Sequence, residues 1–136
     1  MINYTSPPGG QPIIHQTTSM TNTANASVET TACSQTVTIL NPQFVHISFW
    51  MNVSVGAPGL TRVNLRVKDG STILNNKNQV PGVAYGDSSN TYYLVQFSMW
   101  VNLTAGNHTI SVTYQTSGVD SMTIDAGALT IIQWQA

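Results

Sequence analysis

The chain has 136 residues, enough for one domain with a substantial core, and its formal net charge is -1. Charged residues make up only 7% of it, far below the roughly 25% of ordinary soluble domains. So neutral a surface attracts neither nucleic acid nor an anionic membrane, and no apolar run approaches the ~20 residues needed to cross a bilayer. Weak charge repulsion between copies instead suits self-association or packing against a larger assembly.

The first residues differ in composition from the rest of the chain. Residues 7–12 are rich in proline and glycine, and such a segment cannot continue a helix or a central strand. Residues 1–12 are therefore predicted to form an extended arm and residues 13–30 an edge strand with a loop, with a disordered tail as the alternative. The N-terminus has neither the basic nor the apolar region of a secretion signal. We divide the chain into an N-terminal arm and edge segment, 1–29, and a folded domain, 30–136.

From residue 30 onward, apolar and polar residues alternate with the period of a β-strand. The first predicted strand covers residues 34–40, and the longest covers residues 44–55. The inward residues of the longest strand are Val45, Ile47, Phe49, Met51, Val53 and Val55. Residues 61–68 alternate in the same way, and Asp69-Gly70 predicts a tight hairpin with residues 71–74 as its return strand.

The second half repeats this alternation. Residues 75–90 are polar and turn-rich, with one short strand predicted at residues 83–85. Strands follow at residues 93–104 and 108–114, separated by a turn rich in glycine and asparagine. No window shows a 3.6-residue apolar period, so the prediction is an all-β chain.

Two segments of the chain are similar to each other. Residues 48–56, Ser-Phe-Trp-Met-Asn-Val-Ser-Val-Gly, align without gaps on residues 98–106, Ser-Met-Trp-Val-Asn-Leu-Thr-Ala-Gly. A duplicated hairpin fits a jelly roll built from two similar halves, and chance similarity between two amphipathic strands is the alternative. In either case Trp50 and Trp100 occupy equivalent outward positions.

No catalytic or metal-binding constellation is evident, so neither an enzyme nor a cofactor is expected. The acidic residues are scattered, and the histidines show no zinc-ligand spacing. We expect a structural hydrogen bond for His108, at the start of a strand, whereas His46 on the outer face near Trp50 is a candidate interface residue. Cys33 is the only cysteine, so it forms no intrachain disulfide, and a buried inert thiol is expected.

Aromatic residues are candidates for binding. Trp50, Trp100 and Tyr92 form a candidate glycan platform, because aromatic faces stack on sugars. Burial between subunits is the competing interpretation, and the scarcity of charge favours it.

The last predicted strand, residues 127–134, is apolar on both faces. Leu129 and Ile131 lie on one face and Ala128, Ile132 and Trp134 on the other, so the second face needs its own covering. A subunit interface is the favoured covering, and a loop or the N-terminal segment is the alternative.

Residues 103–114, Leu-Thr-Ala-Gly-Asn-His-Thr-Ile-Ser-Val-Thr-Tyr, precede the final strand Gly-Ala-Leu-Thr-Ile-Ile-Gln-Trp. Together they resemble tumour-necrosis-factor-like and complement-head-like jelly rolls, which share a Leu-x-x-Gly-x-His-x-Ile turn and strand and a final Leu-x-Ile strand. Such jelly rolls recur in tailed-bacteriophage structural proteins. The resemblance implies an antiparallel jelly-roll β-sandwich that forms a homotrimer, with the last strand and its Ala128, Ile132 and Trp134 near the threefold axis.

A small jelly roll with a Pro/Gly arm and no stalk is similar to a capsid decoration (cement) protein of a tailed phage. The expectation is therefore a non-enzymatic viral structural protein on the capsid surface of the virion, assembled in the host cytoplasm. Its partners would be two further copies and the major capsid protein, contacted through an arm that includes Pro7, Pro8, Ile13 and Ile14. The alternative is a receptor- or glycan-binding tip module of a phage tail fibre or similar adhesin, with carbohydrate as its ligand.

Overall fold

The computed structural model describes residues 11–20, 28–55, 59–75, 80–86, 92–117 and 122–134, and these ranges contain strands and turns without a helix. The strands are β1 (Pro12–Thr17), β2 (Thr30–Ile39), β3 (Gln43–Val55), β4 (Gly59–Asp69), β5 (Thr72–Ile73), β6 (Val80–Gly86), β7 (Tyr92–Leu103), β8 (Gly106–Ser117) and β9 (Met122–Trp134).

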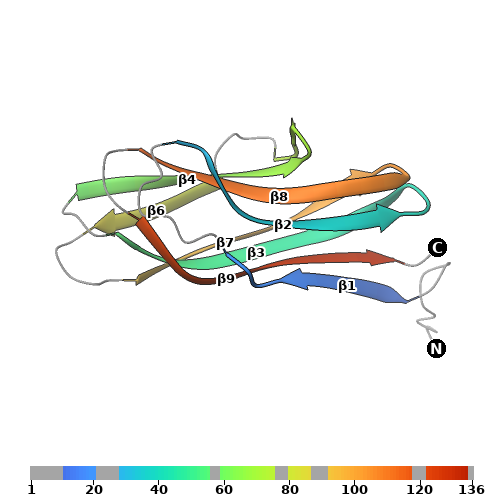
Figure 1. The fold of residues 1–136 in the computed structure, drawn as a ribbon, viewed down its shortest axis with the longest axis horizontal. Helices are drawn as coiled ribbons and strands as arrows, with labels where there is room; N and C mark the ends of the chain where they lie inside the picture. The colour runs from blue at the N-terminus through green and yellow to red at the C-terminus, as the bar shows by residue number, and fades with distance from the viewer. Residues whose placement is uncertain are drawn as a thin grey trace, which may run out of the picture.

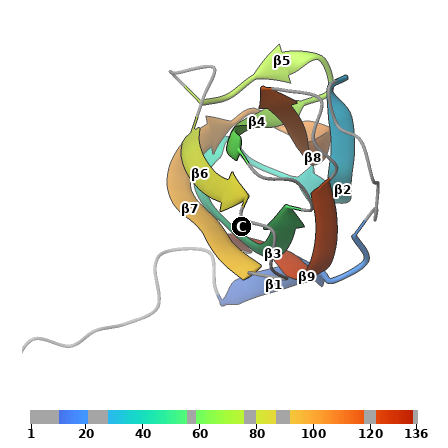
Figure 2. The same ribbon diagram turned by 90° about the vertical axis from the view of Figure 1, so that its left-hand side faces the viewer.

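The strands form two antiparallel sheets. Sheet A has the order β1-β9-β3-β7, and sheet B has the order β2-β8-β4-β5, with β6 also paired to β4. The strands of both sheets run along the long axis of the molecule (Figure 1), and the end-on view shows the two sheets facing each other around a common interior (Figure 2).

The pairing of the strands is nested. β1 pairs with β9, β2 with β8, β3 with β7 and β4 with β6, always antiparallel. A long hairpin rolled up on itself produces this order, so the chain is a jelly-roll β-sandwich and the predicted fold class is confirmed. The short β5 adds the hairpin predicted at Asp69-Gly70, where Asp69 pairs with Thr72 and Gly70 has a φ of 58°.

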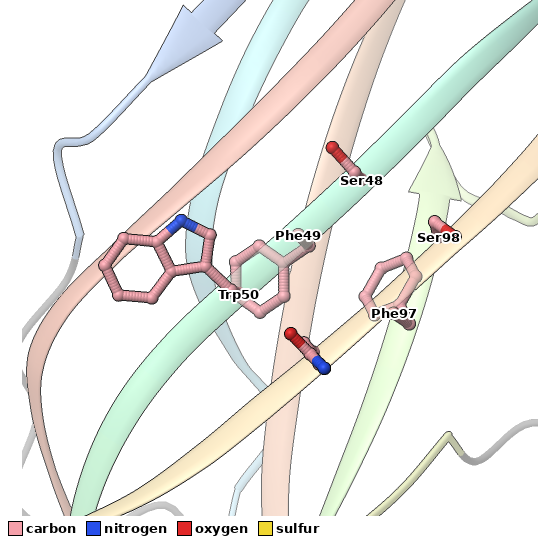
Figure 3. A pocket seen from close by; sticks show the side chains of 6 residues that line it. Ser48, Phe49, Trp50, Phe97 and Ser98 are labelled. Carbon is pink, nitrogen blue, oxygen red and sulfur yellow. The ribbon is translucent and has the colours of Figure 1, made fainter.

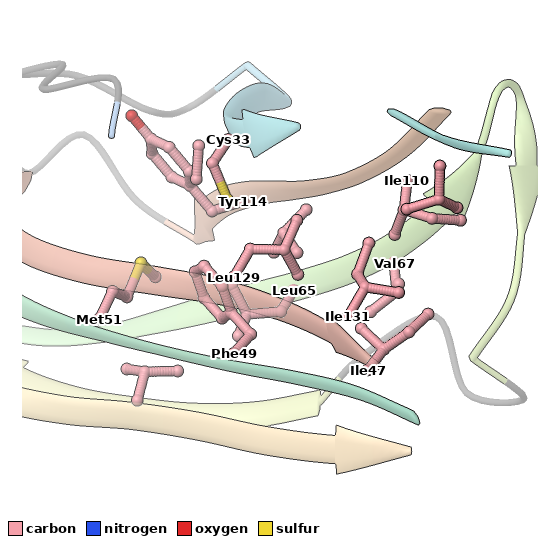
Figure 4. Packing of buried hydrophobic residues seen from close by; sticks show 14 of the residues in the cluster. Cys33, Ile47, Phe49, Met51, Leu65, Val67, Ile110, Tyr114, Leu129 and Ile131 are labelled. Carbon is pink, nitrogen blue, oxygen red and sulfur yellow. The ribbon is translucent and has the colours of Figure 1, made fainter. Parts of the chain in front are cut away.

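The core lies between the sheets and is built from the alternation that the sequence shows. Sheet A contributes Val45, Ile47, Phe49, Met51 and Val53 from β3 and Leu129 and Ile131 from β9; sheet B contributes Leu65, Val67, Ile110, Val112 and Tyr114. Figure 4 shows side chains of both sheets meeting in one cluster. Each fully buried aliphatic side chain of this kind stabilises the fold by about 1.5–3 kcal/mol relative to an exposed one. Cys33 is also buried there, as predicted, and burial raises the pKa of its thiol to about 12.

Most strands extend beyond their predicted bounds, and for β9 and β2 a bulge accounts for the early start. β9 begins at Met122 rather than at residue 127, because a bulge at Asp125 shifts the register with β3 and lets the pairing of the two strands continue beyond it. β2 likewise begins at Thr30, with a bulge at Ala32 that places Ala32 and Cys33 both in the interior.

The N-terminal edge strand is present as β1, and it extends sheet A beside β9 rather than lying over its face. His15 on β1 lies with its Nε2 3.2 Å from Oε1 of Gln133. Ile13 and Ile14 of the predicted arm belong to this strand, whereas Pro7 and Pro8 lie outside the described residues.

Candidate functional site

The outer face of sheet A carries the tryptophans of the chain. All three tryptophans lie on it, because Trp50 on β3, Trp100 on β7 and Trp134 on β9 occupy outward positions of the alternation. Interface and ligand-binding surfaces are enriched in tryptophan, so this face is the candidate functional surface. The side chain of Tyr92, the third residue of the predicted glycan platform, lies outside the described part of the chain.

The antiparallel register arranges this face in rows that cross the sheet. One row joins Ile14, Ile132, His46 and Trp100, and the next joins Gln16, Thr130, Ser48 and Ser98. A third row joins Ala128, Trp50 and Gln96. The outer face is therefore apolar in its first row, hydroxyl-rich in its second, and aromatic again in its third.

The two similar segments of the sequence meet at the centre of this face. Ser48 and Ser98 are directly opposite each other on β3 and β7, which run antiparallel. Trp50 and Trp100 each follow their serine by two residues, so a local twofold axis between the two serines relates the two tryptophan positions on the strands.

A shallow groove of about 420 Å³ lies at this axis, and we call it the serine groove. Its described lining residues are Ser48, Phe49, Trp50, Gln96, Phe97 and Ser98. Figure 3 shows Ser48 and Ser98 on neighbouring strands, with the indole of Trp50 extending from β3 to the side away from β7. Trp100 stands beyond Ser98 on the same face of β7.

The two indoles are held by their neighbours while each keeps an exposed surface. Trp50 lies beside its cross-strand partner Ala128, which is only 4% exposed although it is on the outer face, and Trp50 itself is 39% exposed. Trp100 packs against His46 with ring centroids 4.8 Å apart, and it is 58% exposed. Both indoles are therefore partly immobilised. A ligand that binds them would cost less side-chain conformational entropy than one that had to order free side chains.

A second feature of the same face is an apolar corner, formed by Ile14, Phe44, Ile132 and Trp134. Ile14 and Phe44 are 64% and 61% exposed, while Ile132 and Trp134 are half-buried. The backbone N–H of Trp134 donates to Oε1 of Gln43, at 2.7 Å, which fixes the end of β9 next to the start of β3. Of the three residues predicted at a trimer interface, Ile132 and Trp134 lie in this corner, whereas Ala128 is covered within its own chain and offers little surface.

The polar clusters of the described residues have structural roles. On sheet B, Glu29 accepts hydrogen bonds from Arg66 at 2.6 Å and Thr113 at 2.8 Å, and it forms an ion pair with Lys68. The hydrogen bonds from Lys68 and Thr113 lower the pKa of the Glu29 carboxyl. This cluster joins the segment before β2 to β4 and β8.

His108 makes the structural hydrogen bonds that its position predicts. Its Nδ1 lies 2.6 Å from Oδ2 of Asp69 and its Nε2 lies 2.8 Å from the carbonyl oxygen of Thr104. Burial disfavours the charged ring, but the Asp69 carboxylate and the Thr104 carbonyl outweigh it and raise the pKa of His108. Because both nitrogens face acceptors and neither faces a hydroxyl or thiol, this pair is a clamp between two turns rather than a general base.

Other kinds of site find no support within the described ranges. The His, Cys, Asp and Glu side chains described form no group of three that could hold a metal ion. No helix long and apolar enough to cross a membrane occurs in the same part of the chain.

The sequence identified the tryptophans of this face but not all the residues between them. Ser48, Gln96 and Ser98 were missed as lining residues, although the repeated serine in the two similar segments was the signal for two of them. Phe44 was missed as well, because a single apolar residue at the start of a strand does not show which neighbours it meets.

No family model matches the chain, and no curated protein sequence matches it. Among solved structures, it is similar to a chain in the structure of infectious bursal disease virus, Gx strain. The TM-score is 0.64, and the identity is 13% over 97% of this chain and 36% of the other. It is also similar to the VP2 subviral particle of that virus, with a TM-score of 0.62 and 12% identity over 98% of this chain and 37% of the other.

The chain thus spans little more than a third of the viral chains that it matches. At 12–13% identity the likeness shows a shared fold, a jelly roll of the kind found in viral capsid proteins. A weaker likeness joins it to a tumour necrosis factor, Eiger, from S. frugiperda, with a TM-score of 0.47 and 10% identity over 74% of this chain and 66% of the other.

Proposed function

We propose that the chain is a non-enzymatic structural protein of a virion, specifically a trimeric decoration protein on the head of a tailed phage. The observation that carries this proposal is the fold, which matches viral capsid structures over nearly the whole chain. The low charge supports it, because copies of a nearly neutral chain can pack closely without repulsion.

The apolar corner supplies the surface for self-association. Ile14 and Ile132 are cross-strand partners, and the register of β3 with β9, continued by two residues, brings Phe44 across from Trp134. Four large apolar side chains at one end of a sheet form a patch that a monomer rarely exposes. Three copies that meet at this corner would cover it and place β9 near the threefold axis.

The N-terminal arm is the proposed contact with the major capsid protein. β1, which carries Ile13 and Ile14, lies at the edge of sheet A beside β9 and directly follows the proline- and glycine-rich segment that contains Pro7 and Pro8. Attachment would then rest on distributed contact, with no cofactor, nucleic acid or membrane involved.

The trimer is tested by the mass of the chain in solution, measured by light scattering after size exclusion. We expect three times the 14.6 kDa of one chain, and a smaller mass for the double variant Ile14→Ser with Ile132→Ser. Leu94→Ser is the matched control, because Leu94 is 58% exposed on the same face but outside the corner. A monomeric native chain, or a double variant that remains trimeric, would sink the interface assignment.

The arm is tested separately. A chain that lacks residues 1–12 should keep the trimeric mass but fail to pellet with virions from which the protein has been removed. Undiminished pelleting would assign the capsid contact to another surface.

A further inference from the structure

The serine groove combines two properties that seldom occur together on a protein surface. Trp50 lines the groove, and Trp100 lies two residues beyond Ser98 on the same face of β7, where its indole is also exposed. The polar side chains of the groove are those of Ser48, Ser98 and the longer Gln96. From strand geometry, Trp50 and Trp100 are separated by four residues along the sheet and one strand across it, so their Cα atoms lie about 14 Å apart.

This arrangement fits a sugar chain better than a protein. A pyranose ring has an apolar face of C–H bonds, which can stack on an indole, and a rim of hydroxyls, which needs hydrogen-bonding partners. Ser48 and Ser98 supply donors and acceptors between the two tryptophan positions, and Gln96 supplies them across from Trp50. The separation of the indoles leaves room for more than one ring, so the complementary ligand is an oligosaccharide rather than a single sugar.

The groove is a poor candidate for the buried centre of a subunit interface. Serine is depleted at interface cores, since its hydroxyl must find a partner when water is removed. The second row of the face, with Gln16 and Thr130 beside the serines, continues this polar character across the whole sheet. The apolar corner, which has no such row within it, is the better place for a neighbouring subunit.

The lack of charged side chains in the groove favours neutral sugars over acidic ones. None of its described lining residues is charged, and His46, two residues before Ser48 on β3, packs against Trp100 with the ring planes tilted by 56°. An acidic sugar would therefore find no cation to pair with.

We propose that the serine groove binds a neutral oligosaccharide, with pyranose rings stacked on Trp50 and Trp100 and hydroxyls bonded to Ser48, Ser98 and Gln96. Such binding gives a particle surface weak attachment to a glycan-coated cell, strengthened by the number of copies. The site does not depend on the virion role, since the groove lies within one chain.

The test is isothermal titration calorimetry of the full chain against maltotriose, cellotriose, mannotriose and triacetylchitotriose, with 3'-sialyllactose as the charged comparison. We expect at least one neutral trisaccharide to bind, and Trp50→Ala and Trp100→Ala each to weaken it at least about tenfold. Ser98→Val, which fills the groove but keeps both indoles, should also abolish binding. Ser111→Val on the outer face of sheet B and Phe44→Ala in the apolar corner are matched controls and should bind normally.

Three results would overturn the proposal: no binding of any neutral trisaccharide, binding that survives in both tryptophan variants, or a Ser98→Val chain that binds as well as the native one. The mass of each variant separates this site from the trimer interface. Trp100→Ala should keep the native mass, while Ile132→Ser should lower the mass and leave sugar binding intact. If Trp100→Ala instead dissociates the assembly, a second copy occupies the groove and the sugar assignment is wrong.

Discussion

Replacing Asp69 by asparagine should destabilise the fold more at pH 6 than at pH 8.5. His108 sits between Asp69 on the β4–β5 hairpin and Thr104 on the β7–β8 turn, with both ring nitrogens facing oxygen acceptors. Only the doubly protonated ring can donate to both of them. The asparagine side chain would retain the size of the native one but remove the negative charge that favours this imidazolium.

The sign of the pH dependence follows from the raised pKa of folded His108. In the unfolded chain the imidazole titrates near its ordinary pKa of about 6.5. The clamp therefore contributes its full stability below about pH 6.5, and that contribution is lost as the pH rises through the higher pKa of the folded state. Asp69→Asn should remove most of this dependence.

The magnitude follows from the contacts. A hydrogen bond to a charged group is worth about 1.5–3 kcal/mol when it is shielded from water. The side chains of His108 and Asp69 are 11% and 24% exposed, so shielding is substantial but incomplete. We expect Asp69→Asn to lower the free energy of unfolding by about 2 kcal/mol at pH 6, or about 6–8 °C in Tm, and by less than half of that at pH 8.5.

The measurement is urea unfolding followed by tryptophan fluorescence at the two pH values, in native and variant chains. The two chains differ only at position 69, so contributions that do not involve Asp69 cancel in the difference. Asp125→Asn, at an exposed position in the β9 bulge, is the control and should change stability by less than about 0.5 kcal/mol. Equal losses for Asp69→Asn at both pH values would show that the clamp does not depend on a charged His108.

Two further predictions concern the interior. Cys33 should resist a thiol reagent such as DTNB at about pH 8 until the chain is unfolded, because burial raises the pKa of its thiol to about 12; rapid labelling of the native chain would contradict its buried position. Gly127→Ala should lower the free energy of unfolding by about 1–3 kcal/mol in thermal or urea unfolding. The added Cβ would lie 2.7 Å from the carbonyl oxygen of Trp50 and 3.1 Å from Met51 Cβ. An unchanged stability would mean that β3 and β9 can move apart at this point.

The strands and the faces of the sandwich could be predicted from the sequence because alternation is a local signal. Val45 through Val53 are buried at every second position, as their pattern predicts. The order of strands could not be predicted in the same way. β1 and β9 stand at opposite ends of the sequence, and only tertiary packing makes them neighbours.

The candidate site likewise depends on pairing between distant strands, which the sequence does not show. The internal similarity placed Trp50 and Trp100 at equivalent positions, but nothing local indicated that Ser48 and Ser98 are cross-strand partners. The partner of His108 was hidden for the same reason, since Asp69 lies 39 residues earlier in the chain. Bulges add a further difficulty, because the extra residue at Asp125 lets β9 begin at Met122, before the start that the alternation predicts.

The most direct test of the virion role is cryo-electron microscopy of particles from a phage that carries this gene, compared with particles from the same phage with the gene deleted. We expect threefold density on the head surface that disappears in the deletion and is fitted by three jelly rolls meeting at their apolar corners. Identical heads in the two samples, or density that is lost only from the tail, would contradict the virion role proposed for this chain.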